Sequence, residues 1–248
     1  MRYCFTTLAV GEPYEQYATD LFLEMNQKTT EGAYYIVGND EFSIPDPPPG
    51  LFVKNASMPQ WNMGTGGFDF YFNAKVLGLK FVLDQERLTG EKHDYVFYVD
   101  GDWQLHTGFE EEKILSMLDF MDTHNFDFLF ERPAQIKDSK EDPKNSFFCD
   151  KLYDYHVFDH SRWDEAHCVN EQFLVFKNGP KFKYFVQRWE QFLWYSIANK
   201  IRNYAEGFEI GVSALEANMN WEFRGVFGHF LRDCFKFYAA TGQLHFRY

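Results

Sequence analysis

The sequence predicts an α/β fold: a three-layer sandwich in which a central, mostly parallel sheet lies between two layers of helices. Apolar runs of strand length alternate along the chain with longer segments whose apolar residues recur at helical spacing. The run 94–99 is apolar on both of its faces, as in a strand covered on both sides. A length of 248 residues suits one such domain.

The first half contains three predicted strands and two predicted helices. Residues 3–10 form an apolar run that ends before Gly11, and Pro13 then suits the first turn of a helix whose apolar positions extend to Met25. Residues 33–37 predict a second strand, and residues 94–99 a third. Between these two strands, apolar residues at helical spacing predict a long helix over 68–83.

The second half is predicted to be richer in helices. The stretch 107–110 fits a capping box that opens a helix through Met121. Strands are expected at 126–131 and 172–176, followed by helices at 180–204, 209–219 and 226–238. We expect a single domain over 1–248, with residues 1–105 forming a nucleotide-binding half and residues 106–248 an acceptor-binding half.

The net charge of −13 argues against a nucleic-acid polymer as partner, because phosphate backbones are bound by clustered Lys and Arg. An acidic protein can still bind a diphosphate when a divalent cation reverses the local field. The four cysteines form no Cys-x-x-Cys pair, and no apolar stretch reaches 18 residues. With no signal peptide recognised, we expect a cytoplasmic protein without a transmembrane segment.

Two aspartates directly follow the apolar run 94–99, separated by one glycine that permits a sharp, left-handed backbone. Asp100 and Asp102 could bind one hard cation, Mn²⁺ or Mg²⁺, either both directly or one through water. In parallel sheets, ligands bind at the carboxyl ends of strands, where these residues are predicted to lie. Alternatively, Asp100–Gly101 is a hairpin turn with residues 103–105 as the return strand, and both interpretations can hold together.

The run 94–102, DYVFYVDGD, resembles the DxD segment of GT-A-fold glycosyltransferases. The resemblance implies a Rossmann-like GT-A fold in which Asp100, Gly101 and Asp102 bind the metal and the diphosphate of a nucleotide-sugar. By analogy with that fold, Thr6, Thr7, Ala9 and Glu12 would meet the base and ribose, Asp40 would face the base or ribose, and Lys75 would approach the diphosphate. Taken singly, each of these six is equally compatible with a surface or structural role.

A second resemblance lies near the C-terminus, in residues 206–210 (EGFEI) and 228–232 (GHFLR). These segments are similar to those of polypeptide N-acetylgalactosaminyltransferases and, for the first segment, β-1,4-galactosyltransferases. The resemblance assigns His229 as the third metal ligand and Glu206 as an acceptor-holding residue. The next position is Asp or Asn in those families and Gly207 here, so this chain either uses Glu206 or Glu209 as the catalytic base or is mechanistically different. Glu209 as a carboxylate near a helix N-terminus, and His229 as an ordinary helix histidine, are the alternatives.

The sequence therefore predicts a metal-dependent glycosyltransferase, a hexosyltransferase, that uses a UDP- or GDP-sugar and a glycan or other hydroxyl acceptor. A sugar-phosphate nucleotidyltransferase is the first alternative, disfavoured because no Gly-rich basic loop follows the first strand. A non-catalytic carbohydrate-binding protein, using the aromatic residues that make up 20% of the chain, is the second.

Overall fold

The computed structural model describes residues 1–11, 13–56, 72–135, 155, 165, 167–199, 206–222 and 226–237. The strands are β1 (Tyr3–Leu8), β2 (Gly32–Gly38), β3 (Leu51–Asn55), β4 (Tyr95–Val99), β5 (Trp103–Leu105), β6 (Phe128–Gln135), β7 (His167–Lys177), β8 (Trp221–Glu222) and β9 (Phe235–Phe237). The helices are α1 (Tyr14–Lys28), the 3₁₀ helix η1 (Phe72–Lys75), α2 (Val76–Thr89), α3 (Glu111–Thr123), α6 (Pro180–Ala198), α7 (Glu206–Glu216) and α8 (Val226–Cys234).

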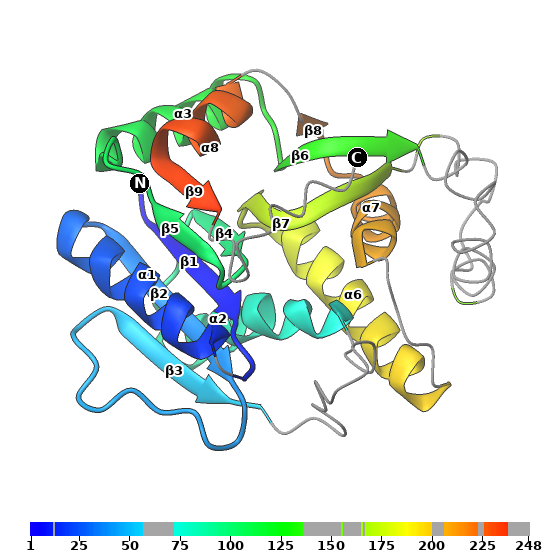
Figure 1. The fold of residues 1–248 in the computed structure, drawn as a ribbon. Coiled ribbons are helices and arrows are strands. Elements are labelled where there is room, and N and C mark those ends of the chain that lie inside the picture. The colour runs from blue at the N-terminus through cyan, green and yellow to red at the C-terminus, as the bar shows by residue number, and fades with distance from the viewer. Residues whose placement is uncertain are drawn as a thin grey trace.

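Seven strands form one central sheet in the order β3-β2-β1-β4-β7-β6-β8 (Figure 1). Strands β3, β2, β1 and β4 are parallel, whereas β7 runs antiparallel to both of its neighbours, β4 and β6. The parallel strands therefore all end at one edge of the sheet, which we call the carboxyl edge. A separate antiparallel pair, β5 with β9, lies outside this sheet.

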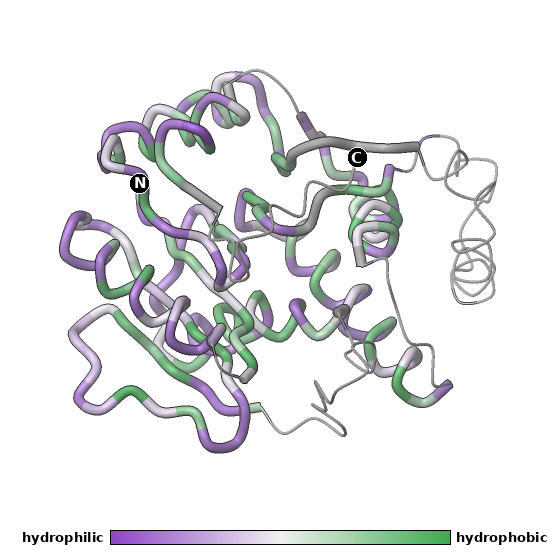
Figure 2. Tube along the Cα trace, viewed as in Figure 1, coloured by the Kyte–Doolittle hydropathy of each residue, from purple (hydrophilic) through white to green (hydrophobic). Residues whose placement is uncertain are grey.

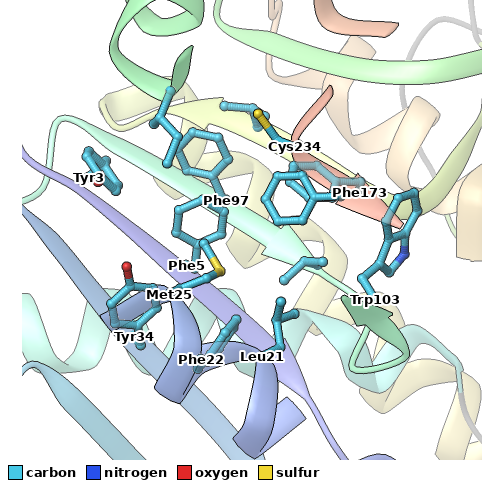
Figure 3. Packing of buried hydrophobic residues seen from close by; sticks show 14 of the residues in the cluster. Tyr3, Phe5, Leu21, Phe22, Met25, Tyr34, Phe97, Trp103, Phe173 and Cys234 are labelled. Carbon is cyan, nitrogen blue, oxygen red and sulfur yellow. The ribbon is translucent and has the colours of Figure 1, made fainter. Parts of the chain in front are cut away.

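Helices cover both faces of the sheet, because alternate residues of its apolar central strands point to opposite sides. On one face, Phe5 and Phe97 stack at 4.3 Å between ring centroids and pack with residues of α1, α3 and α8. Figure 3 shows Phe22 and Met25 of α1 on this side. On the other face, Tyr98 and its neighbours pack with α2, α6 and α7. The helices alternate between hydrophilic and hydrophobic positions along their length, as Figure 2 shows.

The predicted fold class, a three-layer α/β sandwich with a mostly parallel central sheet, is confirmed. The five predicted strands are present as β1, β2, β4, β6 and β7. The short strands β3, β8 and β9 were not predicted, because runs of two to five residues carry little periodicity. Strand β6 continues to Gln135, beyond the predicted end of this strand at residue 131.

Three local predictions are wrong. The capping box at 107–110 does not form: α3 begins at Glu111, and its N-cap, Glu110, makes no side-chain capping bond. The last predicted helix ends at Cys234, since residues 235–237 pair with β5 instead. The hairpin alternative fails as well, because β5 pairs with β9 and not with β4. The first part of the helix predicted at 68–83 lies outside the described residues.

Of the cysteines, Cys4 and Cys234 are fully buried, as their apolar neighbours indicate. No helix in the described part of the chain is long and apolar enough to cross a membrane.

Candidate functional site

The Asp-Gly-Asp turn lies at the carboxyl edge of the sheet, directly after central strand β4. The backbone N–H of Asp100 still bonds to the carbonyl of Gln172, which lies in the neighbouring strand β7, at 2.9 Å. The chain then turns tightly, with the N–H of Trp103 3.3 Å from the carbonyl of Asp100, and leaves the sheet as β5. The turn therefore follows the last position at which β4 is held in the sheet.

Gly101 is required here for space and not for a left-handed backbone. It is absent from the described glycines with positive φ, so the left-handed conformation that glycine permits is not adopted here. A Cβ atom on Gly101 would lie 3.2 Å from Cβ of Ala18 and 3.3 Å from the carbonyl oxygen of Tyr14. The missing side chain lets the turn pack against the first turns of α1.

Asp100 accepts a hydrogen bond on each carboxylate oxygen. Lys75, at the end of η1, places its Nζ 3.0 Å from Oδ2, and the Tyr98 hydroxyl lies 3.1 Å from Oδ1. The Lys75 and Asp100 side chains are only 10% and 20% exposed, so solvent screens this ion pair less than one on the open surface. Asp100 is thus an ionised carboxylate with a fixed orientation.

Asp102 differs sharply from Asp100. Its Oδ1 atom is buried and has no hydrogen-bond partner among the described residues. Burial, and secondly the negative charge of Asp100, raise the pKa of Asp102 to about 7, although Lys75 opposes the shift. Tyr14 faces the same pair: burial and then the charges of Asp102 and Asp100 raise its pKa. Without a further positive charge, ionising Asp102 is unfavourable.

This arrangement fits a divalent cation. Hard cations such as Mn²⁺ and Mg²⁺ prefer carboxylate oxygens and keep coordination positions open for substrate phosphates. The buried oxygen of Asp102 needs either a proton or a cation, and Asp100 supplies a second carboxylate in the same turn. Two protein carboxylates are sufficient for Mg²⁺, which usually retains several waters.

The structure does not bring His229 to this pair. Within the described ranges, no three His, Cys, Asp or Glu residues form a group that could hold a metal ion. His229 is exposed on α8, and its Nδ1 lies 2.8 Å from Nη2 of Arg232. When Nδ1 accepts that bond, the neutral ring carries its proton on Nε2, and neither nitrogen has a lone pair free for a metal.

The residues assigned to the nucleotide by analogy lie on β1 and beside the carboxyl edge. Thr6, Thr7 and Ala9 are fully buried, and the two threonine hydroxyls lack a hydrogen-bond partner in the part of the chain that the structure describes. Asp40 is exposed two residues beyond the end of β2, where Asn55 donates to its backbone carbonyl. Glu12 lies outside the described residues. Of this set, Lys75 contacts the Asp-Gly-Asp turn through its side chain, with its Nζ 3.0 Å from Oδ2 of Asp100.

Helix α7 carries both candidate bases, and its two glycines allow it to pack closely against β7. A Cβ on Gly207 would lie 2.2 Å from the carbonyl oxygen of Val169, and one on Gly211 only 1.6 Å from that of His167. An Asp or Asn at position 207, as the resembling families have, would therefore not fit this packing.

Glu209 is fully buried and accepts a 2.6 Å hydrogen bond from the hydroxyl of Ser213. Glu206 begins α7, and the structure describes its backbone but not its side chain. The burial of Glu209 favours a structural role for this carboxylate over direct contact with an acceptor.

Sequence reasoning missed Tyr98 and Tyr14 as parts of the site. Tyr98 precedes Asp100 by two residues on a strand, so both side chains lie on the same face, and this spacing could have revealed the contact. Tyr14 could not be found in this way, because α1 meets the turn only through the tertiary fold.

Three cavities formed by described residues are not lined by the aspartates of the turn. One of about 470 Å³ lies between α2 and α6, another of about 590 Å³ between β3 and α2, and a third of about 310 Å³ beside the first turns of α1. Asp100 and Asp102 line none of these three, so the case for the site rests on its charges and contacts.

No family model matches the sequence, and no curated protein matches it. Among solved structures, a glycosyltransferase involved in the glycosylation of the major capsid of PBCV-1 is similar, with a TM-score of 0.47 and 8% identity over 97% of this chain and 95% of that one.

The galactosyltransferase LgtC, in complex with donor and acceptor sugar analogues, is also similar, with a TM-score of 0.42 and 11% identity over 89% of this chain and 73% of that one. An active-site mutant of LgtC gives a TM-score of 0.41 and 11% identity over 89% and 72%. TM-scores and identities this low do not establish a shared activity.

Proposed function

We propose that this protein is a divalent-metal-dependent glycosyltransferase that moves a hexose from a UDP- or GDP-sugar to a hydroxyl group of a glycan or other acceptor. The observation that carries the proposal is the buried, unpartnered oxygen of Asp102 beside the ionised Asp100, at the carboxyl edge of the sheet. An acidic chain of net charge −13 needs such a site to hold a diphosphate.

Asp100 and Asp102 would hold Mn²⁺ or Mg²⁺, which neutralises the charge that develops on the departing nucleoside diphosphate. Lys75 lies 3.0 Å from Asp100 and would add a second positive charge near the same phosphates. This lysine also keeps Asp100 ionised when no ligand is bound, so the turn is ready for a cation.

A transfer reaction also needs a group that removes the proton of the acceptor hydroxyl when the configuration at the anomeric carbon inverts. Of the two glutamates on α7, Glu209 is buried and bonded to Ser213. We therefore propose Glu206 as the base and Glu209 as a residue that supports the helix. His229, as a third metal ligand, stays a prediction that would require its bond with Arg232 to break.

The proposal is tested by incubating the purified protein with a panel of UDP- and GDP-sugars and measuring release of the nucleoside diphosphate. We expect release with Mn²⁺ or Mg²⁺ and none in EDTA. Asp102→Asn should lower the rate at least ~100-fold, the size expected when several kcal/mol of charge stabilisation is lost. Asp84→Asn is the matched control. Asp84 lies in the second half of α2, where it pairs with Lys54 of β3 and with Arg87.

Turnover that survives Asp102→Asn would refute the metal role of the turn. Pyrophosphate release from a nucleoside triphosphate and a sugar phosphate would identify a nucleotidyltransferase instead. Glycan binding that persists in EDTA, without affinity for any nucleotide-sugar, would identify a non-catalytic carbohydrate-binding protein.

A further inference from the structure

Tyr98 places a hydroxyl group inside a mainly apolar layer. It is the fourth residue of β4, its side chain is fully buried, and it belongs to the cluster that packs beneath α2, α6 and α7. A buried hydroxyl is unfavourable unless it is hydrogen-bonded, and phenylalanine would fill the same space without that requirement. The hydroxyl therefore needs an explanation beyond packing.

The hydroxyl has a partner outside the apolar layer. It donates its proton to Oδ1 of Asp100, 3.1 Å away. Burial, and then the charge of Asp100, raise the pKa of Tyr98 well above its usual value. The phenol therefore stays neutral and remains a hydrogen-bond donor to the carboxylate.

Tyr98 and Lys75 reach Asp100 from different elements and bind different oxygens, Oδ1 and Oδ2. One donor on one oxygen would leave the carboxylate free to rotate about its own axis. Two donors from a rigid strand and a helix end fix both its position and its plane. Lys75 supplies charge as well as geometry, whereas Tyr98 supplies geometry alone.

We propose that Tyr98 is a positioning residue that pre-orients Asp100, from inside the sheet, for a divalent cation bound at the Asp-Gly-Asp turn. This inference rests on the proposed metal-dependent function. When the protein ligands of a cation are already held in place, binding of the cation costs less conformational entropy. Without the hydroxyl, Asp100 keeps its charge and its contact with Lys75 but loses its fixed plane.

The test compares the substitutions Tyr98→Phe and Tyr95→Phe. Tyr95 lies on the same strand as Tyr98 and is equally buried. The Tyr95 hydroxyl faces the carbonyl of Leu118 at 3.5 Å, away from the turn. Mn²⁺ affinity is measured on the full chain by electron paramagnetic resonance of the free ion, with no nucleotide-sugar present. Urea unfolding of both variants reports any general loss of stability.

We expect Tyr98→Phe to weaken Mn²⁺ binding about tenfold, the size of one hydrogen bond to a charged group, and Tyr95→Phe to leave it unchanged. In turnover assays the KM for Mn²⁺ should rise by a similar factor, while kcat at saturating Mn²⁺ stays within about twofold.

The measurements distinguish a failure of the role proposed for Tyr98 from a failure of the proposed metal dependence. Unchanged Mn²⁺ affinity in Tyr98→Phe, with normal binding by the unmodified chain, would overturn the role of Tyr98 alone. If the unmodified chain binds no divalent cation, the proposed metal dependence fails and the role of Tyr98 fails with it. Equal weakening by both tyrosine substitutions would reduce the effect to a general loss of packing and would also overturn the inference.

Discussion

At the edge of the sheet where the parallel strands begin, a buried carboxylate is fully satisfied, whereas at the carboxyl edge a buried carboxylate is not. Glu86, at the end of α2, accepts hydrogen bonds from the backbone N–H of His93 and the side chain of Asn178, both at 2.8 Å. Burial alone would raise its pKa, but the contact of its Oε1 with Nδ1 of His93 at 3.2 Å, together with these two bonds, outweighs burial and lowers it. Asp102 has a buried oxygen without a partner, and its pKa is raised to about 7.

Glu111 repeats the pattern of Glu86 at the same edge. It accepts bonds from the hydroxyl of Tyr3 at 2.6 Å and from the backbone N–H groups of Thr30 and Glu31. Burial opposes ionisation here too, yet these bonds lower the pKa of Glu111. Both glutamates thus connect helix ends to strand ends and stabilise the fold.

The hydrogen bonding of a buried carboxylate distinguishes a structural role from a ligand-binding role. A carboxylate that exists to hold the fold acquires donors within the chain, whereas one that lacks them has a free position for a ligand. Fold stability should therefore depend on Glu86, and activity on Asp102.

The largest expected loss of stability comes from Glu86→Ala. Removing this carboxylate leaves the N–H of His93 and one amide proton of Asn178 without their acceptor, so the free energy of unfolding should fall by about 2–3 kcal/mol. Urea unfolding measures this loss. Nucleoside diphosphate release by the folded variant should stay within about twofold of that of the unmodified chain, and a loss like that of Asp102→Asn would contradict the comparison.

A pH-dependent effect of opposite sign is expected from Asp102→Asn. Because the pKa of Asp102 in the native state lies near 7, above that of an unfolded aspartate, the native state holds a proton that the unfolded chain releases between about pH 4 and 7. The free energy of unfolding contributed by this group therefore falls as pH rises through that window, and the penalty is complete above pH 7.

The asparagine variant lacks this penalty, so relative to the unmodified chain it should gain little at pH 4 and about 4 kcal/mol above pH 7, measured by urea unfolding in EDTA. Saturating Mn²⁺ should stabilise only the unmodified chain and so make it more stable than the asparagine variant. A difference between the two proteins that does not change with pH would show that Asp102 is not held in an unfavourable charged state.

Much of the fold and part of the site could be predicted because their signals are local. The strand over 94–99 and the two aspartates after it lie within nine consecutive residues, so their juxtaposition needs no tertiary information. The pairing of β5 with β9 joins residues about 130 positions apart, and Phe235 packs there against Trp103 at 6.4 Å between ring centroids. Helical periodicity around 226–238 could not reveal that partner.

The two glycines of α7 have a packing role that their spacing in the sequence indicates. Gly207 departs from the catalytic motif of the resembling families, but Gly207 and Gly211, four residues apart, form one face of a helix in backbone contact with β7. That spacing is visible in the sequence and indicates close packing. The position of His229, in contrast, depends on how α8 packs against α3, which no short motif specifies.

The central claim, that a divalent cation at Asp100 and Asp102 holds the diphosphate of a nucleotide-sugar, is tested most directly by thermal unfolding with UDP and GDP, with and without Mn²⁺. We predict that one of these nucleotides raises the melting temperature of the unmodified chain only when Mn²⁺ is present, and that Asp102→Asn abolishes the increase. An equal increase in EDTA, or an undiminished increase in Asp102→Asn, would contradict the account.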